Sequence, residues 1–179
     1  MSLVAAAGIL WSCSRSGDEA PVSTEDERLA LLSEVSDFVL PETEDGPAAS
    51  AVGVPQFLLL ALEHHLADTD VPATPEQSDY VAWLEGELNV RTGGRFLGAA
   101  EAQKEQAVAD MDAAAFRDRS APTPWLKLKQ LILIGYYTSE TGGSDVLRYE
   151  PVPGEFTGDV DIEPGMKALS NDWTGVKYG

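Results

Sequence analysis

Two adjacent histidines, His64 and His65, are residue types that can bind a metal or transfer a proton near neutral pH. Consecutive residues on a helix point about 100° apart, so the two rings cannot chelate one ion. Glu63 and Asp68 nearby do not complete a three-ligand catalytic set. Because imidazolium is favourable at a helix C-terminus, we expect a capping or solvated role at a helix end. The sequence therefore predicts no metal site in this chain.

A second candidate pair, Ser139 and Glu140, resembles a hydroxyl nucleophile beside a carboxylate. A hydroxyl nucleophile needs an adjacent base of suitable proton affinity, and no histidine follows this pair. We therefore expect this segment to close a helix C-terminus through side-chain hydrogen bonds. The glycine pairs at 93–94 and 142–143 form neither a GxGxxG fingerprint nor a phosphate loop. The sequence predicts no catalytic residue and no flavin-binding or other cofactor-binding residue in this chain.

The only cysteine, Cys13, excludes an internal disulfide and a cysteine-based zinc or iron–sulfur site. It follows an apolar stretch, residues 2–11, that has the length of a signal-peptide core and is too short to span a bilayer. Leu10-Trp11-Ser12-Cys13 resembles a lipoprotein cleavage site, which makes Cys13 a candidate for lipidation, although Trp11 is unusual there. An apolar tail without a targeting role is the alternative interpretation. We interpret residues 1–22 as a signal-like segment and a linker.

The chain has 179 residues, of which 44% are hydrophobic and 23% charged, and this composition suits one globular domain. Its 30 acidic and 12 basic residues give a net charge of −18. Such acidity excludes nucleic acid as a partner, because phosphate binding needs Lys and Arg. It also disfavours anionic lipid surfaces, so membrane contact would need a lipid anchor or a complex. The acidity favours solubility or a basic protein partner.

Residues 23–137 show the apolar spacing of successive helices. Thr24 and Glu27 fit a capping box that starts a helix ending at Pro41. Three further helices are predicted at residues 56–66, after Pro55, at 74–92, with an N-cap at Thr74 and a break at Gly93, and at 99–116. In the last of these, Val108, Met111 and Phe116 should face inward. Residues 42–54 form a loop that is long for a helical domain.

A helix that is apolar nearly all round should follow from Pro124 and occupy the centre of the domain. Thr123 suits its N-cap and Pro124 its first position, and Trp125 and Tyr136 should face inward. The helix should stop before residues 138–143, where two glycines can adopt positive φ. Residues 138–179 have no regular period and form an extended tail. The predicted fold is all-α, a compact bundle of four or five helices with a long irregular C-terminal tail.

Two blocks, LPETEDGPAASAVGVPQF at 40–57 and GYYTSETGGSDVLRYEPVPGEF at 135–156, resemble the gluconate 2-dehydrogenase subunit 3 family over residues 25–160. The resemblance implies the non-catalytic small subunit of a flavin-dependent dehydrogenase that oxidises a sugar or sugar acid. FAD is then expected in a large partner subunit, with electrons passing to a cytochrome c or a similar acceptor. The small subunit would stabilise the large one, like a chaperone, and assist its export to the periplasm through a twin-arginine (Tat) signal, which would require a start upstream of Met1.

Within the tail, aromatic, proline and arginine residues are the ones that most often anchor interfaces. Arginine is suited to such contacts because its planar fork satisfies several acceptors at once. We expect the tail to dock on the domain and on the large subunit, with a partner interface formed by Tyr136, Tyr137, Ser139, Glu140, Arg148, Tyr149, Pro151, Pro153 and Phe156. The alternative is a free-standing helical envelope lipoprotein that binds a ligand or acts as a scaffold.

Overall fold

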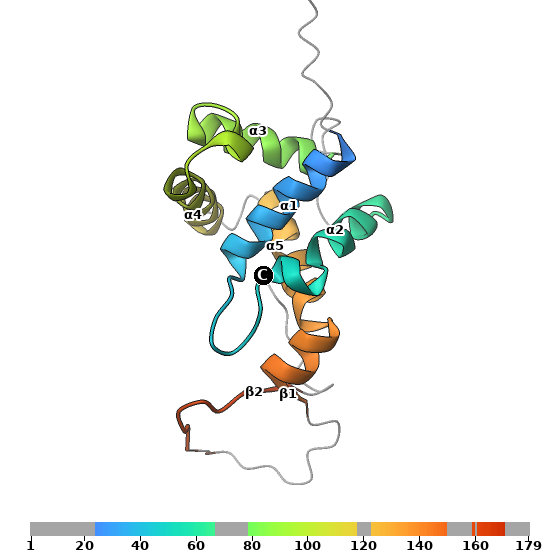
Figure 1. Cartoon of the computed structure of the whole chain (residues 1–179), viewed down its shortest axis with the longest axis vertical. Helices are drawn as coiled ribbons and strands as arrows, with labels where there is room; N and C mark the ends of the chain where they lie inside the picture. Colours follow the sequence, from blue (N-terminus) through green and yellow to red (C-terminus); the bar gives the residue numbers. More distant parts are fainter. Residues whose placement is uncertain (1–23, 67–78, 118–122, 150–158, 160, 171–179) are drawn as a thin grey trace, which may run out of the picture.

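The computed structural model describes residues 24–66, 79–117, 123–149, 159 and 161–170. Within these ranges the chain forms five α-helices: α1 (Glu25–Val39), α2 (Val54–Glu63), α3 (Tyr80–Thr92), α4 (Glu101–Arg117) and α5 (Pro124–Tyr137). Helix α5 contacts each of the other four, so it is the central element of the bundle (Figure 1). The predicted all-α bundle is confirmed.

The first two helices begin close to where the sequence places them. The hydroxyl of Thr24 accepts a hydrogen bond from the Glu27 N–H at 3.3 Å, and the Glu27 carboxylate accepts one from the Thr24 N–H at 3.1 Å. This reciprocal capping box was predicted. Helix α2 carries Pro55 in its first turn and ends at Glu63, three residues earlier than predicted. The loop before it contains a short 3₁₀ helix, η1 (Ala49–Val52).

Helix α3 begins later than predicted, because its N-cap is Asp79. The capping signature at Thr74 lies outside the described residues. The Asp79 carboxylate accepts hydrogen bonds from two backbone N–H groups of the first turn and from Arg28 of α1. Arg28 and those N–H groups lower the pKa of Asp79, because they stabilise its charged form. Gly93, with φ 69°, ends the helix as predicted, and a second 3₁₀ helix, η2 (Phe96–Gly98), connects it to α4.

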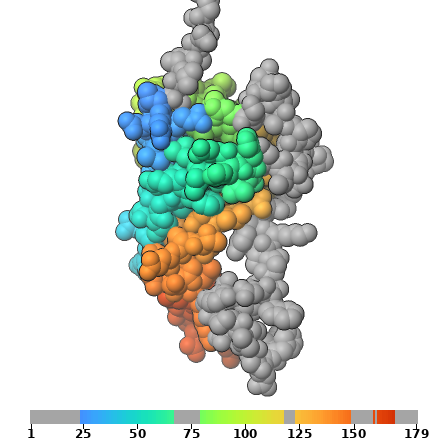
Figure 2. All heavy atoms as spheres, turned by 90° about the vertical axis from the view of Figure 1, so that its right-hand side faces the viewer, coloured from blue at the N-terminus to red at the C-terminus, as the bar shows by residue number. Residues whose placement is uncertain are grey.

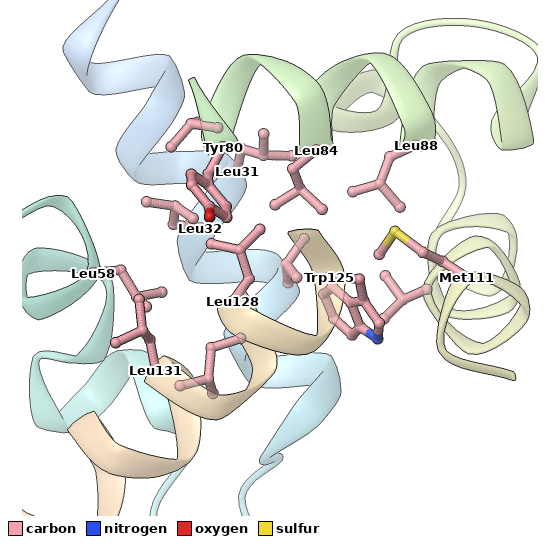
Figure 3. Packing of buried hydrophobic residues seen from close by; sticks show 14 of the residues in the cluster. Leu31, Leu32, Leu58, Tyr80, Leu84, Leu88, Met111, Trp125, Leu128 and Leu131 are labelled. Atoms are coloured by element: carbon pink, nitrogen blue, oxygen red, sulfur yellow. The ribbon is translucent and has the colours of Figure 1, made fainter. Parts of the chain in front are cut away.

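Buried side chains of α5 pack against those of the neighbouring helices in the core (Figure 3). The predicted inward orientation of Trp125 and Tyr136 is confirmed, since they are 1% and 4% exposed. Val108 and Met111 of α4 are also buried, but Phe116 is only partly buried. The apolar core is completed by Leu31, Leu32, Val35, Ala49, Val54, Leu58, Ala61, Tyr80, Val81, Leu84, Leu88, Phe96, Ala107, Ala115, Leu128, Leu131 and Ile132.

The N-terminus of α5 differs from the prediction in one respect. Thr123 occupies the N-cap position, but its hydroxyl makes no capping hydrogen bond, and its oxygen is buried without a partner among the described residues. Pro124 at the first helical position needs no partner for a missing N–H. The helix start therefore rests on Pro124 and on the packing of Trp125, whose indole N–H donates to Asp112 of α4 at 2.7 Å.

Beyond α5 the chain forms a π-helical turn, η3 (Gly142–Val146), and two short strands, β1 (Leu147–Tyr149) and β2 (Ala168–Ser170). The strands pair in parallel, with Leu147 opposite Ala168. This part lies at the end of α5 that points away from α3 and α4 (Figure 1). The sequence predicted an extended tail for residues 138–179; its described part contains this turn and this strand pair, and the remaining residues lie outside the described ranges. Among the described helices, none has both the length and the apolarity that a membrane span requires.

Candidate partner-binding surface

The end of α5 is closed by side chains, as predicted for residues 138–140. The Thr138 hydroxyl donates to the Ile134 carbonyl at 2.7 Å, and the Ser139 hydroxyl donates to the Tyr136 carbonyl at 2.7 Å. Ser139 also accepts a hydrogen bond from the Gly142 N–H at 3.0 Å. The Ile134 and Tyr136 carbonyls also accept hydrogen bonds from the backbone N–H groups of Thr138 and Ser139, so the two hydroxyls add to the bonds that close this helix end. Ser139 is therefore a helix-closing residue, and Glu140 beside it is exposed.

Gly142 and Gly143 do not use the positive φ that glycine allows, since positive φ among the described glycines occurs only at 53, 93 and 165. Gly142 is required for steric reasons. A Cβ atom there would lie 1.9 Å from the Tyr136 carbonyl oxygen, which no side-chain rotation can relieve because the oxygen belongs to the backbone. The π turn thus brings the chain back against the last turn of α5. Such π turns are rare in proteins, and those that occur are often found at functional sites.

Tyr136 links this turn to the loop before α2. Its hydroxyl donates to the Pro47 carbonyl at 2.9 Å, and its ring makes an edge-to-face contact with Tyr137 at a centroid distance of 5.2 Å. A Cβ atom on Gly46 would lie 2.7 Å from Val146 Cγ2 and 2.8 Å from the Tyr136 hydroxyl. Burial raises the pKa of Tyr136 above its ordinary value.

A second contact joins the same two segments. A Cβ atom on Gly135 of α5 would lie 2.6 Å from the Phe57 ring of α2, so the two helices approach closely at this point. The segments 46–57 and 135–146 therefore meet at two places, in a set of contacts that we call the junction: Gly46, Pro47, Phe57, Gly135, Tyr136, Gly142 and Val146. The two blocks that the sequence singled out, about 90 residues apart in the chain, are neighbours in the fold.

The structure places the predicted interface residues in different environments. The Tyr136 side chain is in the core, so it cannot itself form a surface contact. Tyr137 and Ser139 are partly buried, whereas Glu140 and Arg148 are exposed. Tyr149 is placed by the pairing of its backbone with Ser170 of β2. Pro151, Pro153, Phe156 and the lipidation candidate Cys13 lie outside the described residues, and the prediction of a partner interface stays a prediction.

The histidines lie where the sequence placed them, at a helix end. His64 is the C-cap of α2, and His65 follows it with φ 56°. Both are exposed. Within the described ranges, no group of three or more His, Cys, Asp or Glu side chains is arranged to hold a metal ion.

Two hollows lie on either side of Trp125, and the sequence did not predict them. One, of about 310 Å³, is bordered by α3, α4 and the start of α5, and includes Trp83, Met111 and Thr123. The other, of about 270 Å³, includes Phe38, Asp112 and Lys129. Asp112 of α4 and Lys129 of α5 form a salt bridge at 2.8 Å. Both hollows border α4, whose outer residues are mostly exposed. Their linings combine apolar rings with ion-paired groups.

The fold and the junction define a small all-α protein in which segments 46–57 and 135–146 pack against each other near the C-terminal end of α5. A family model described as Gluconate 2-dehydrogenase subunit 3 matches residues 26–154, and the chain belongs to this family. The match spans all five described helices, the junction and β1. Comparisons with curated proteins and with solved structures gave no match. The family description is that of one subunit of a multi-subunit dehydrogenase.

Proposed function

We propose that this chain is the non-catalytic accessory subunit of an FAD-dependent dehydrogenase that oxidises a sugar or sugar acid. It binds the large, flavin-holding subunit, stabilises it and assists its export to the periplasm. The electrons then leave the complex for a cytochrome c or a similar acceptor. The observation that carries this proposal is the family match over residues 26–154.

The geometry supports a role in binding. The junction packs the start of the tail against α5, because the Gly142 backbone lies directly against the Tyr136 carbonyl in the turn that precedes β1. A preformed surface loses less conformational entropy on binding than a flexible segment does. Three residues of the proposed contact lie next to this packed turn: the exposed Glu140 and Arg148 and the partly buried Tyr137. These residues, with Tyr149, Pro151, Pro153 and Phe156, form the proposed contact with the large subunit.

Co-expression tests the proposal. Each FAD-dependent dehydrogenase chain of the source genome is produced in a heterologous host with and without a tagged copy of this chain. We expect one flavoprotein to co-purify with the tag, to retain FAD by its visible absorbance, and to lose soluble yield when this chain is omitted. Failure of every flavoprotein to co-purify would contradict the proposal, and ligand binding by the lone chain would then favour the helical lipoprotein instead.

Export is tested separately in the source organism. Removing residues 3–13 should leave both this chain and its flavoprotein partner in the cytoplasm, because the signal would serve both. Cys13→Ala distinguishes the anchor from the export signal, since lipidation needs the thiol and translocation does not. Periplasmic flavoprotein in the absence of residues 3–13 would contradict the export role.

A further inference from the structure

Among the five described α-helices, α2 has the most apolar sequence, in a protein that is acidic as a whole. Residues 54–62 contain no charged side chain, in a chain with 30 acidic and 12 basic residues. One side of the helix packs on α1 and α5 through Val54, Pro55, Leu58 and Ala61, all buried. Leu60 lies on the opposite side and is 55% exposed. Leu60 is not part of the described core, so packing among the described residues does not account for its exposed surface.

The end of α2 adds a second leucine to this place. His65 has φ 56°, its N–H donates to the Leu62 carbonyl at 3.1 Å, and the Leu66 N–H donates to the Ala61 carbonyl at 2.9 Å. These two bonds define a Schellman motif, in which the residue two after the cap packs back against the last helical turn. Here that residue is Leu66, and the turn carries Leu60. Leu66 is nonetheless 56% exposed, so the pair presents an apolar surface.

The α2 patch, Leu60 and Leu66, belongs to a helix that packs against α5 and to the turn that follows this helix. Figure 2 shows α2 directly above the last turn of α5 and the described start of the tail. A partner large enough to cover both α2 and the end of α5 would contact the α2 patch and the interface proposed for the tail. This continuity distinguishes the patch from Val90 of α3, a single aliphatic side chain that is 81% exposed.

Charge decides between the possible occupants. Two copies of this chain would bring together two net charges of −18, which repel each other at moderate salt. An anionic lipid surface is disfavoured for the same reason. A different protein with an apolar pocket bordered by Lys and Arg would gain both from burying the leucines and from pairing with Glu63, which is exposed one turn after Leu60.

We propose that the α2 patch is an anchor for the flavoprotein large subunit, which receives Leu60 and Leu66 in an apolar pocket with a basic border. The inference rests on the proposed function and adds a second contact to the tail. Exposed leucines that become buried in an interface increase the affinity through the hydrophobic effect. The basic border mainly raises the association rate and makes that rate depend on salt.

The test compares Leu60→Gln/Leu66→Gln with Val90→Gln in the full chain. Glutamine keeps the charge and is a good helix former, so each variant removes only apolar surface. The probe is the flavoprotein that co-purifies with the wild type, and the readout is the Kd measured at two salt concentrations. We expect the double variant to weaken binding about tenfold or more, Val90→Gln to leave it unchanged, and higher salt to weaken wild-type binding.

Three results would overturn the inference. Wild-type binding of the flavoprotein with an unchanged Kd in the double variant would place the contact elsewhere while leaving the proposed function intact. Self-association of the lone wild-type chain that the double variant abolishes, seen by sedimentation, would make a second copy the occupant. Binding to phosphatidylcholine or phosphatidylglycerol vesicles that the double variant abolishes would make it a lipid surface. Absence of any flavoprotein complex with the wild type would instead contradict the proposed function itself.

Discussion

The junction and the α2 patch lie on neighbouring parts of the molecule and place opposite demands on their residues. At the junction, three glycines and two aromatic rings leave no room for an added methyl group. At the patch, two leucines are more than half exposed. The difference teaches that internal packing explains the residues of the junction, whereas the exposed leucines of the patch form the part of the surface for which we propose a partner.

The largest effect on stability should come from Gly142→Ala. The new Cβ would lie 1.9 Å from the Tyr136 carbonyl oxygen, so the backbone of the π turn has to move. We expect the free energy of unfolding to fall by about 3 kcal/mol, at the upper end of overpacking effects. Denaturant unfolding followed by circular dichroism measures it.

Gly86→Ala is the matched control for this change. Gly86 lies within α3, and its added Cβ would meet no atom within 4 Å. The variant should gain up to about 1 kcal/mol, because alanine is the better helix former. Equal stability loss in the two variants would mean that the junction is not specially crowded.

Gly46→Ala should have a smaller effect than Gly142→Ala. The nearest atoms, Val146 Cγ2 at 2.7 Å and the Tyr136 hydroxyl at 2.8 Å, belong to side chains that can shift. We expect a loss of about 1–2 kcal/mol. The loss should shrink in a Val146→Ala background, which removes the closest atom; an unchanged loss would show that the two segments are not coupled through this contact.

Tyr136→Phe tests the hydrogen bond to Pro47 and should cost about 1 kcal/mol at neutral pH. Burial raises the Tyr136 pKa above 10.0, so the folded state holds the phenolic proton more tightly than the unfolded state. Its contribution is therefore complete below pH 10.0 and is lost as the pH rises through the folded pKa. The stability difference between wild type and Tyr136→Phe should stay constant up to that pH and then shrink; a difference that widens there would contradict this assignment.

The smallest effect on the lone chain should come from Leu60→Gln/Leu66→Gln. Exposed positions usually change stability by less than about 0.5 kcal/mol, so the melting temperature should stay close to that of the wild type. A fall as large as that of Gly46→Ala would show that the patch belongs to the subunit's own core, and the contrast with the junction would disappear.

The helices could be predicted from the sequence because their signals are local. The capping box of Thr24 and Glu27, Pro124 at the start of α5 and the closing role of Ser139 each depend on residues within one or two turns. The sequence did not predict Asp79 as the N-cap of α3. The capping signature at Thr74 lies shortly before it and is an equally local signal, so local spacing alone could not choose between the two positions.

The junction could not be predicted because its contacts are distant in sequence. Gly46 meets Val146 and Phe57 meets Gly135, and no spacing rule connects such residues. Gly142 was noticed as a glycine that permits positive φ, yet its actual requirement is the close approach of a carbonyl. Of the residues proposed for the interface, Glu140 and Arg148 are exposed, as a surface role requires. The Tyr136 side chain is buried instead, and its hydroxyl donates to the Pro47 carbonyl, 89 residues away in the chain.

The most direct test measures the flavoprotein Kd and the unfolding free energy of two variants, Gly142→Ala and Leu60→Gln/Leu66→Gln, in parallel. The account predicts that the first loses stability and binds only in proportion to its folded fraction. It predicts that the second keeps wild-type stability and loses about tenfold or more in affinity. A double variant that binds as tightly as the wild type, or that unfolds like Gly142→Ala, would contradict the account.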